Sequence, residues 1–77
     1  MGIKVYGDNY LNNVLGVDAE EVKEDLVGED SAGSYDIARD DEKNVYLVNK
    51  SNSDVIDAEM TQKDMIESYG RDEEETR

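Results

Sequence analysis

The sequence predicts a small α+β protein, an antiparallel sheet of three to four strands with short helices packed on one face. Three observations lead to this fold class. The chain has 77 residues, enough for one domain only. Short β-prone runs in its second half are separated by polar turns. Two stretches begin with a helix-capping pattern and end at a glycine, which predicts helices around the strands.

The N-terminal third is predicted to form a strand and two helices. Residues 3–6 are β-prone and end at Gly7, which indicates a first strand. Asp8 can cap a short helix that Gly16 ends. Such a helix would carry four apolar residues on one stripe: Tyr10, Leu11, Val14 and Leu15.

The next segment, residues 18–27, is predicted to be helical. Asp18 is followed three residues later by Glu21, as in a capping box. Val22 and Leu26 are spaced i, i+4, and Gly28 follows as a stop. A strand is the competing interpretation, because this apolar stripe is thin.

The second half of the chain is predicted to form the main sheet and a last helix. Residues 29–33 are turn-like, and residues 35–39 alternate apolar and polar, as a half-buried strand does. A hairpin loop at 40–44 leads to the strongest strand signal, 45–48. A polar turn at 49–53 precedes a third sheet strand at 54–59.

A final helix is predicted to start at Thr61 with a capping-box-like pattern and to end at Gly70. We therefore expect one acidic α+β domain over residues 1–70 and a disordered acidic tail over 71–77, which has no apolar side chain. The expected core consists of Val5, Leu11, Val14, Leu15, Val22, Leu26, Tyr35, Ile37, Val45, Leu47, Val55, Met65 and Ile66.

Composition argues against catalysis. The chain has neither histidine nor cysteine, so Ser-His-Asp and Cys-His arrangements are impossible, as are thiolate and imidazole metal sites. It has no phosphate-binding glycine loop. None of its six glycines has the ligand pattern of an EF-hand calcium loop. We expect no enzyme activity, no cofactor and no dedicated metal site.

The absence of cysteine also gives no reason to expect an oxidising compartment. The first residues lack the apolar run of a signal peptide, and no stretch approaches the roughly 18 apolar residues of a membrane span. The expected location is the cytoplasm, with no membrane association.

Negative charge is the most informative feature of the chain. It has 21 acidic and 8 basic residues, a net charge of −13. Residues 18–42 hold eleven of the acids and only two bases, so the charge is concentrated in predicted secondary structure. Acidic runs are usually solvated faces, but this density opposes compaction of a small domain. Ten residues are therefore candidates for contacting a basic partner: Glu20, Glu21, Glu24, Asp25, Glu29, Asp30, Asp36, Asp40, Asp41 and Glu42.

Small size, no cysteine or histidine, the acidic stretch 18–42 and the hairpin predicted between Tyr35 and Val48 make the chain resemble the phage-encoded DNA-mimic proteins. This group includes inhibitors of uracil-DNA glycosylase, restriction enzymes, RNA-guided nucleases and nucleoid-associated proteins. The resemblance is greatest to an inhibitor of the nucleoid protein HU from a Bacillus phage. It rests on charge display, so it assigns no role to any single residue.

The resemblance implies an inhibitor that acts in the host bacterial cytoplasm and binds no nucleic acid itself. A homodimer is also expected, because dimerisation would enlarge the core of so small a domain. Its partner would be a basic DNA-binding protein, HU first, with uracil-DNA glycosylase, RNA polymerase or a nuclease as other possibilities. HU-type proteins hold the DNA backbone and minor groove with little base specificity, so carboxylates can compete for their surface. The alternative is an acidic adaptor or structural phage protein that docks on a basic partner without displacing nucleic acid.

Overall fold

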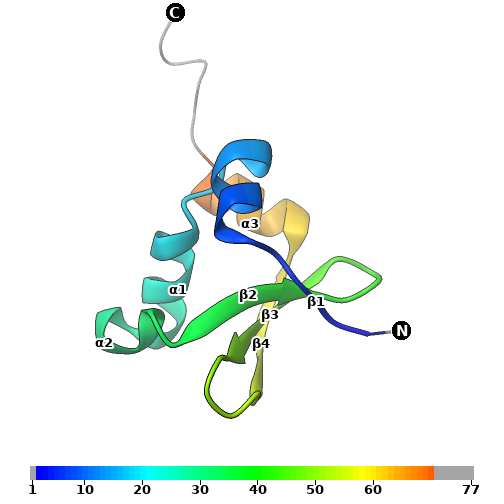
Figure 1. Cartoon of the computed structure of the whole chain (residues 1–77). Coiled ribbons are helices and arrows are strands. Elements are labelled where there is room, and N and C mark those ends of the chain that lie inside the picture. The colour runs from blue at the N-terminus through cyan, green and yellow to red at the C-terminus, as the bar shows by residue number, and fades with distance from the viewer. Residues whose placement is uncertain (1, 71–77) are drawn as a thin grey trace, which may run out of the picture.

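The computed structural model describes residues 2–70, in which four antiparallel strands and four short helices form one α+β fold (Figure 1). The strands are β1 (Lys4–Val5), β2 (Tyr35–Arg39), β3 (Asn44–Asn49) and β4 (Val55–Thr61), in the order β1-β2-β3-β4. The helices are η1 (Tyr10–Leu15), α1 (Ala19–Val27), α2 (Glu29–Ala32) and α3 (Gln62–Tyr69). The predicted fold class is confirmed. The predicted tail, 71–77, lies outside the described residues.

The strand predictions hold with small changes in length. The Asp40–Lys43 turn joins β2 to β3, with Ile37 opposite Leu47 in the ladder. The strand predicted at residues 54–59 is β4. Its pairing with β3 is irregular, with a shift in register between Val45 and Tyr46. Glu59 lies at this bulge with a φ of 60°, in the left-handed region.

The two predicted capping boxes begin helices, but the prediction that Asp8 caps the first helix is wrong. The N-cap of η1 is Asn9, without a side-chain hydrogen bond, and the Asp8 carboxylate pairs with Lys23 instead. The Asp18 carboxylate accepts a hydrogen bond from the Glu21 amide at the start of α1. At the start of α3, Thr61 and Asp64 bond to each other's backbone amides in a complete capping box. Residues 29–33, predicted to be a turn, instead contain the single helical turn α2. The buried side chain of Ala32 and its amide bond to Gly28 hold that turn in place.

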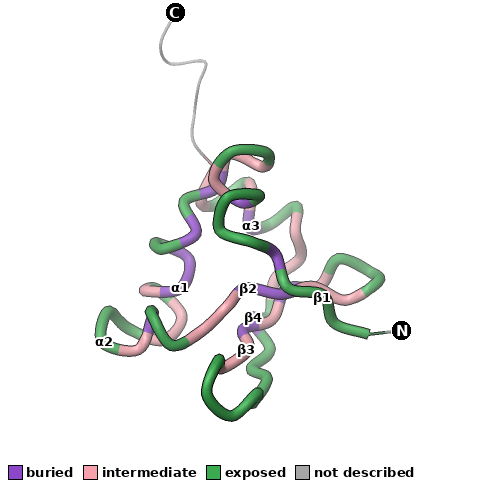
Figure 2. Tube along the Cα trace, viewed as in Figure 1, coloured by how far each residue is buried: buried purple, intermediate pink, exposed green. Residues whose placement is uncertain are grey.

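The core lies between one face of the sheet and the helices. Ile37 and Leu47 are fully buried at the sheet centre, and Val22 of α1 and Met65 of α3 are fully buried from the helical side. Figure 2 shows buried residues on α1 and in the strands, and exposed residues along α2 and the two hairpin turns. Leu15, Leu26, Tyr35 and Ile66 are partly buried and pack against this core, as predicted.

Three residues predicted for the core are exposed. Val5 is 54% exposed because Tyr6, its neighbour in the chain, takes the inward position instead. Val55 is 49% exposed, at the start of the edge strand β4. Val14 is 66% exposed because η1 winds as a π-helix, so the α-helical spacing used to predict its stripe does not apply. The core residues missed by the sequence analysis are Tyr6, Val17, Ala19, Ala32, Ala38 and Ala58.

The end of α3 closes the fold against the segment between η1 and α1. Gly70 pairs with Val17 in an isolated bridge, and the Asp18 amide donates to the Tyr69 carbonyl. A Cβ atom on Gly70 would clash with the carbonyl oxygen of Ile66, which belongs to the backbone and cannot rotate away as a side chain can. This position therefore requires glycine.

We expect Gly70→Ala to lower the free energy of unfolding by about 1–3 kcal/mol, the usual cost of forcing an atom into an occupied space. Gly33→Ala is the matched control, because Gly33 has a φ of −70° and no atom within 4 Å of the added carbon. We expect it to be neutral or to stabilise the protein slightly. Urea denaturation measures both, and equal losses would contradict this account of Gly70.

Candidate acidic partner-binding surface

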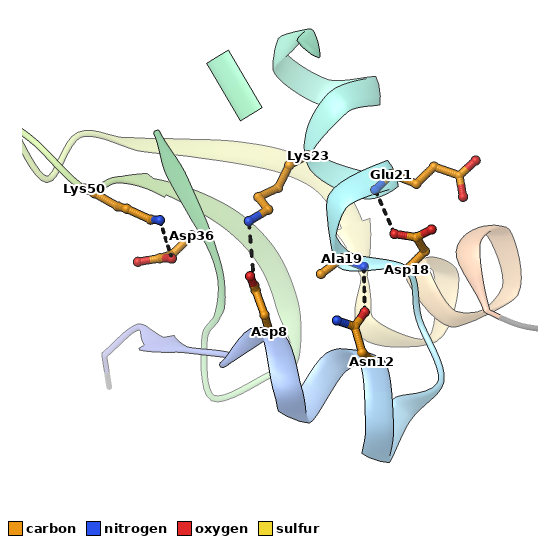
Figure 3. Close-up of polar contacts among 8 residues, drawn as sticks. All are labelled: Asp8, Asn12, Asp18, Ala19, Glu21, Lys23, Asp36 and Lys50. Carbon is orange, nitrogen blue, oxygen red and sulfur yellow. Dashed lines mark hydrogen bonds and ion pairs between the residues drawn. The ribbon is translucent and has the colours of Figure 1, made fainter. Parts of the chain in front are cut away.

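The acidic residues of α1 lie on the side opposite its buried face. Successive helical residues are about 100° apart. Ala19, Val22 and Lys23 are buried on one side. The other side carries the acids, of which Glu24 is half-buried and the rest are exposed: Glu20, Glu21, Glu24 and Asp25. In Figure 3, the Glu21 carboxylate points away from the side of α1 that Lys23 leaves.

Helix α2 extends this array past Gly28. Its first two residues, Glu29 and Asp30, are both exposed. We call these two residues and the four acids of α1 the acidic helical surface. It contains six of the ten predicted partner-binding residues.

The cation within this segment is turned away from the acidic helical surface. Lys23 is the only basic residue between positions 18 and 32. Its side chain is only 8% exposed, and its Nζ atom lies 3.6 Å from the Asp8 carboxylate on the far side of α1 (Figure 3). Lys23 shares the buried side of α1 with Ala19 and Val22, although a lysine among acids is normally expected on the solvated side. The carboxylates of the acidic helical surface are left without a cation from their own helices.

The electrostatics of Glu24 reflect this crowding. Partial burial raises the pKa of Glu24, and the carboxylates of Glu20 and Glu29 raise it further. Since Glu29 belongs to α2, the two helices act as one negative region. Asp25, at the C-terminal end of α1, accepts a hydrogen bond of 2.9 Å from the Tyr69 hydroxyl, which ties this surface to α3.

The other four predicted residues lie elsewhere. Asp36 is on β2, 3.9 Å from the Lys50 ammonium, and is partly neutralised by it. Asp40, Asp41 and Glu42 form the turn at the end of β2 remote from α2 (Figure 1). The ten residues therefore do not form one continuous surface.

Asp40 has a structural role in that turn. Its carboxylate accepts hydrogen bonds from the amides of Asn44 and Glu42 and from the Tyr46 hydroxyl. The Asn44 amide is the main reason that the pKa of Asp40 is lowered. An aspartate bonded to its own turn in this way holds the hairpin and is a poor candidate for partner contact.

Glu24 and Asp40 should affect stability with opposite signs. The raised pKa of Glu24 means that its contribution to stability falls as pH rises from the unfolded pKa to the folded one. The lowered pKa of Asp40 gives a contribution that is present above the unfolded pKa and is lost as pH falls through the folded one. At neutral pH and low salt, we expect Glu24→Gln to raise Tm and Asp40→Ala to lower it.

Circular dichroism melts at neutral and acid pH measure these shifts. Both should shrink in acid, where the two carboxyls are protonated in the folded and unfolded states alike. High salt should reduce the Glu24→Gln effect more than the Asp40→Ala effect, because hydrogen bonds are screened less than exposed charges. A fall in Tm for Glu24→Gln at neutral pH would contradict the crowding at this position.

The two lysine ion pairs form a matched test of the burial of Lys23. Lys23→Gln should lower the free energy of unfolding by about 1–3 kcal/mol. The glutamine side chain stays buried but lacks the ion pair that Lys23 forms with Asp8. Lys50→Gln changes the net charge equally but breaks an exposed pair, with side chains 51% and 37% exposed, and should cost at most about 1 kcal/mol. Chemical denaturation compares them, and similar costs would contradict a special role for Lys23.

Neither a metal-binding cluster nor a membrane-spanning helix is present in the part of the chain that the structure describes. Within residues 2–70, no group of three or more acidic side chains is placed to hold a metal ion. The longest described helix, α1, has nine residues, and none is long and apolar enough to cross a bilayer. Comparison of the chain with protein-family models, with curated proteins and with solved structures finds no match.

Proposed function

We propose that this protein is a DNA mimic, whose acidic helical surface occupies the basic DNA-binding surface of a host protein and blocks its DNA binding. One observation carries the proposal. Six carboxylates cover the outer side of α1 and α2, while Lys23, the one cation of that segment, is buried and paired on the other side. Lysines and arginines that grip phosphates would meet an array with no competing cation from its own helices.

The charge spacing of α1 supports this proposal. Its four acids, from Glu20 to Asp25, span about 7.5 Å along the helix axis at 1.5 Å per residue, or one charge per roughly 2.5 Å. B-DNA carries one charge per roughly 1.7 Å as a duplex and one per roughly 3.4 Å along a single strand. The helix holds carboxylates that are four residues apart at fixed separations. The surface therefore offers a rigid array of charges whose density lies between those of a single strand and a duplex.

The partner that suits such a surface is one that reads charge and shape. HU-type proteins contact the backbone and minor groove with little base specificity, and a carboxylate array presents no base edges. We therefore place HU first, in the bacterial cytoplasm, and uracil-DNA glycosylase, RNA polymerase and nucleases after it. The chain itself should bind no DNA duplex, because its net charge of −13 repels phosphates.

A homodimer is part of the proposal. The sheet face opposite the helices exposes Val5 and Val55, and a second copy packed there would bury them and add a second acidic row. Sedimentation equilibrium at low and moderate salt measures the association. A monomer at all salt concentrations would remove the dimer from the proposal and leave the acidic surface of one chain to act alone.

Affinity capture from a bacterial lysate tests the proposed function. The full chain should retain a DNA- or RNA-binding protein at low salt and lose most of it at moderate salt, because exposed charge pairs are screened. A retained set with no nucleic-acid-binding protein would overturn the proposal. A captured protein that keeps its DNA while bound would support the adaptor alternative instead.

A further inference from the structure

A basic hollow lies at the β1 end of the sheet of this acidic protein. It has a volume of about 410 Å³, within the range of roughly 300–1,000 Å³ typical of small-molecule sites. Three of the six lysine and arginine residues in the described chain line it together with two tyrosines: Lys4, Arg39, Lys43, Tyr6 and Tyr10. Half of the described cations therefore gather around one hollow.

The sheet register brings these cations together. Lys4 of β1 is the ladder partner of Arg39 on β2, so both side chains leave the same face of the sheet. Lys43 is in the turn that follows β2, with a φ of 70°. Within residues 2–70, none of the three forms an ion pair with a carboxylate, whereas Lys23 and Lys50 each do. Their charges are thus available to an anion.

The aromatic wall of the hollow is held in place. The rings of Tyr6 and Tyr10 stack with centroids 5.9 Å apart and planes 10° from parallel. Tyr6 is 5% exposed, and its hydroxyl donates a hydrogen bond to Gln62. Tyr10 is 44% exposed, so an aromatic ligand could pack against it while Tyr6 supports it from behind.

The carboxylate of Asp40, the residue after Arg39, is directed away from the hollow. Asp40 directs its carboxylate to the Asn44 amide and the Tyr46 hydroxyl. Tyr46 pairs with Ala38, so it lies on the opposite face of the sheet from Arg39. The Arg39 guanidinium donates to the Asp40 carbonyl oxygen, its one hydrogen bond within the described residues, so further donors remain for a ligand.

We propose that the basic hollow binds a free mononucleotide, with its phosphate against Lys4, Arg39 and Lys43 and its base against Tyr10. Three unpaired cations beside an exposed, supported ring match a ligand that joins a phosphate to an aromatic base. A longer nucleic acid strand would place further phosphates over a chain of net charge −13, which disfavours it relative to a single nucleotide. This site is separate from the acidic helical surface and does not depend on the proposed function.

Amide chemical-shift titration of the ¹⁵N-labelled full chain tests this proposal with 5′-AMP, inorganic phosphate, adenosine and a short oligothymidylate. AMP should shift the amides of residues 4–10 and 39–43 and bind more tightly than any of the other three probes. Lys4→Gln combined with Lys43→Asn should weaken AMP binding by about tenfold or more, since two of three phosphate contacts are lost. Asparagine at position 43 tolerates the left-handed backbone found there.

Two further variants separate the parts of the site. Tyr10→Leu should weaken AMP binding and leave phosphate binding unchanged, because it removes only the ring. Lys63→Gln, an exposed lysine of α3 outside the hollow, is the charge control and should leave both unchanged. Three results with the parent chain would each overturn the proposal. They are the absence of any shift with millimolar AMP, equal affinities for AMP and phosphate, and a higher affinity for the oligothymidylate than for AMP.

Discussion

Neutralising the four acids of α1 should weaken binding to HU about a hundredfold. The variant carries Glu20→Gln, Glu21→Gln, Glu24→Gln and Asp25→Asn, which keep side-chain size and leave the buried face of α1 unchanged. Each exposed charge pair contributes about 0.2–1 kcal/mol, so four together account for a loss of this order. Isothermal titration calorimetry at low salt measures it, and the remaining binding should depend less on salt than that of the parent chain.

A control with the same net charge separates position from total charge. Asp41→Asn, Glu42→Gln, Asp54→Asn and Glu67→Gln remove four exposed acids outside the acidic helical surface. If that surface makes the contact, this variant should bind HU within about threefold of the parent chain, as expected when only long-range charge is altered. Equal losses in the two variants would show that overall charge, or the Asp41–Glu42 turn, carries the binding.

The second large effect is expected at the centre of the core. Leu47→Ala should lower the free energy of unfolding by about 2–5 kcal/mol, because it leaves a cavity under the helices. Leu47 is fully buried on β3. A chain of 77 residues has a total stability of about 4–12 kcal/mol, so this one substitution removes a large share of it.

Ile56→Ala is the control for that experiment. Ile56 is the ladder partner of Leu47 on β4, but its side chain is 40% exposed. The same kind of truncation should therefore cost clearly less than Leu47→Ala, because the site is partly solvated already. Urea denaturation compares the two variants. Comparable losses would show that β4 is buried in solution, for example by a second copy of the chain.

Local signals explain why so much of the fold could be predicted. The capping residues Asp18 and Thr61, the glycine stops and the alternation of residues 35–39 act within a few residues of themselves. The predicted helix at 18–27 and the hairpin at 35–48 follow from them. For Val5 the deciding contact was distant: Tyr6 faces inward instead because β1 pairs with β2, more than 30 residues away.

The candidate site was predictable in charge but not in shape. The acids of α1 share one face because helical periodicity requires it. Sequence patterns do not show that Asp40 is bonded into its own turn, or that Asp36 lies 3.9 Å from the ammonium of Lys50, which follows the end of β3. Nor does it show that Lys23 turns inward to Asp8, since a lysine among acids would normally be assigned to the solvated side. The Lys23–Asp8 and Asp36–Lys50 pairs are tertiary contacts, whereas the Asp40 bonds stay within its own turn. The contacts of Asp36 and Asp40 and the position of the turn reduced the ten candidate residues to six.

The most direct test of the central claim is displacement of DNA from HU. Labelled duplex DNA bound to HU is titrated with the protein, and fluorescence anisotropy reports the fraction of DNA still bound. As a DNA mimic, the parent chain should release the DNA completely, the α1 variant should need about a hundredfold more protein, and the control variant should act like the parent. Binding to HU with the DNA still attached would contradict the DNA-mimic proposal.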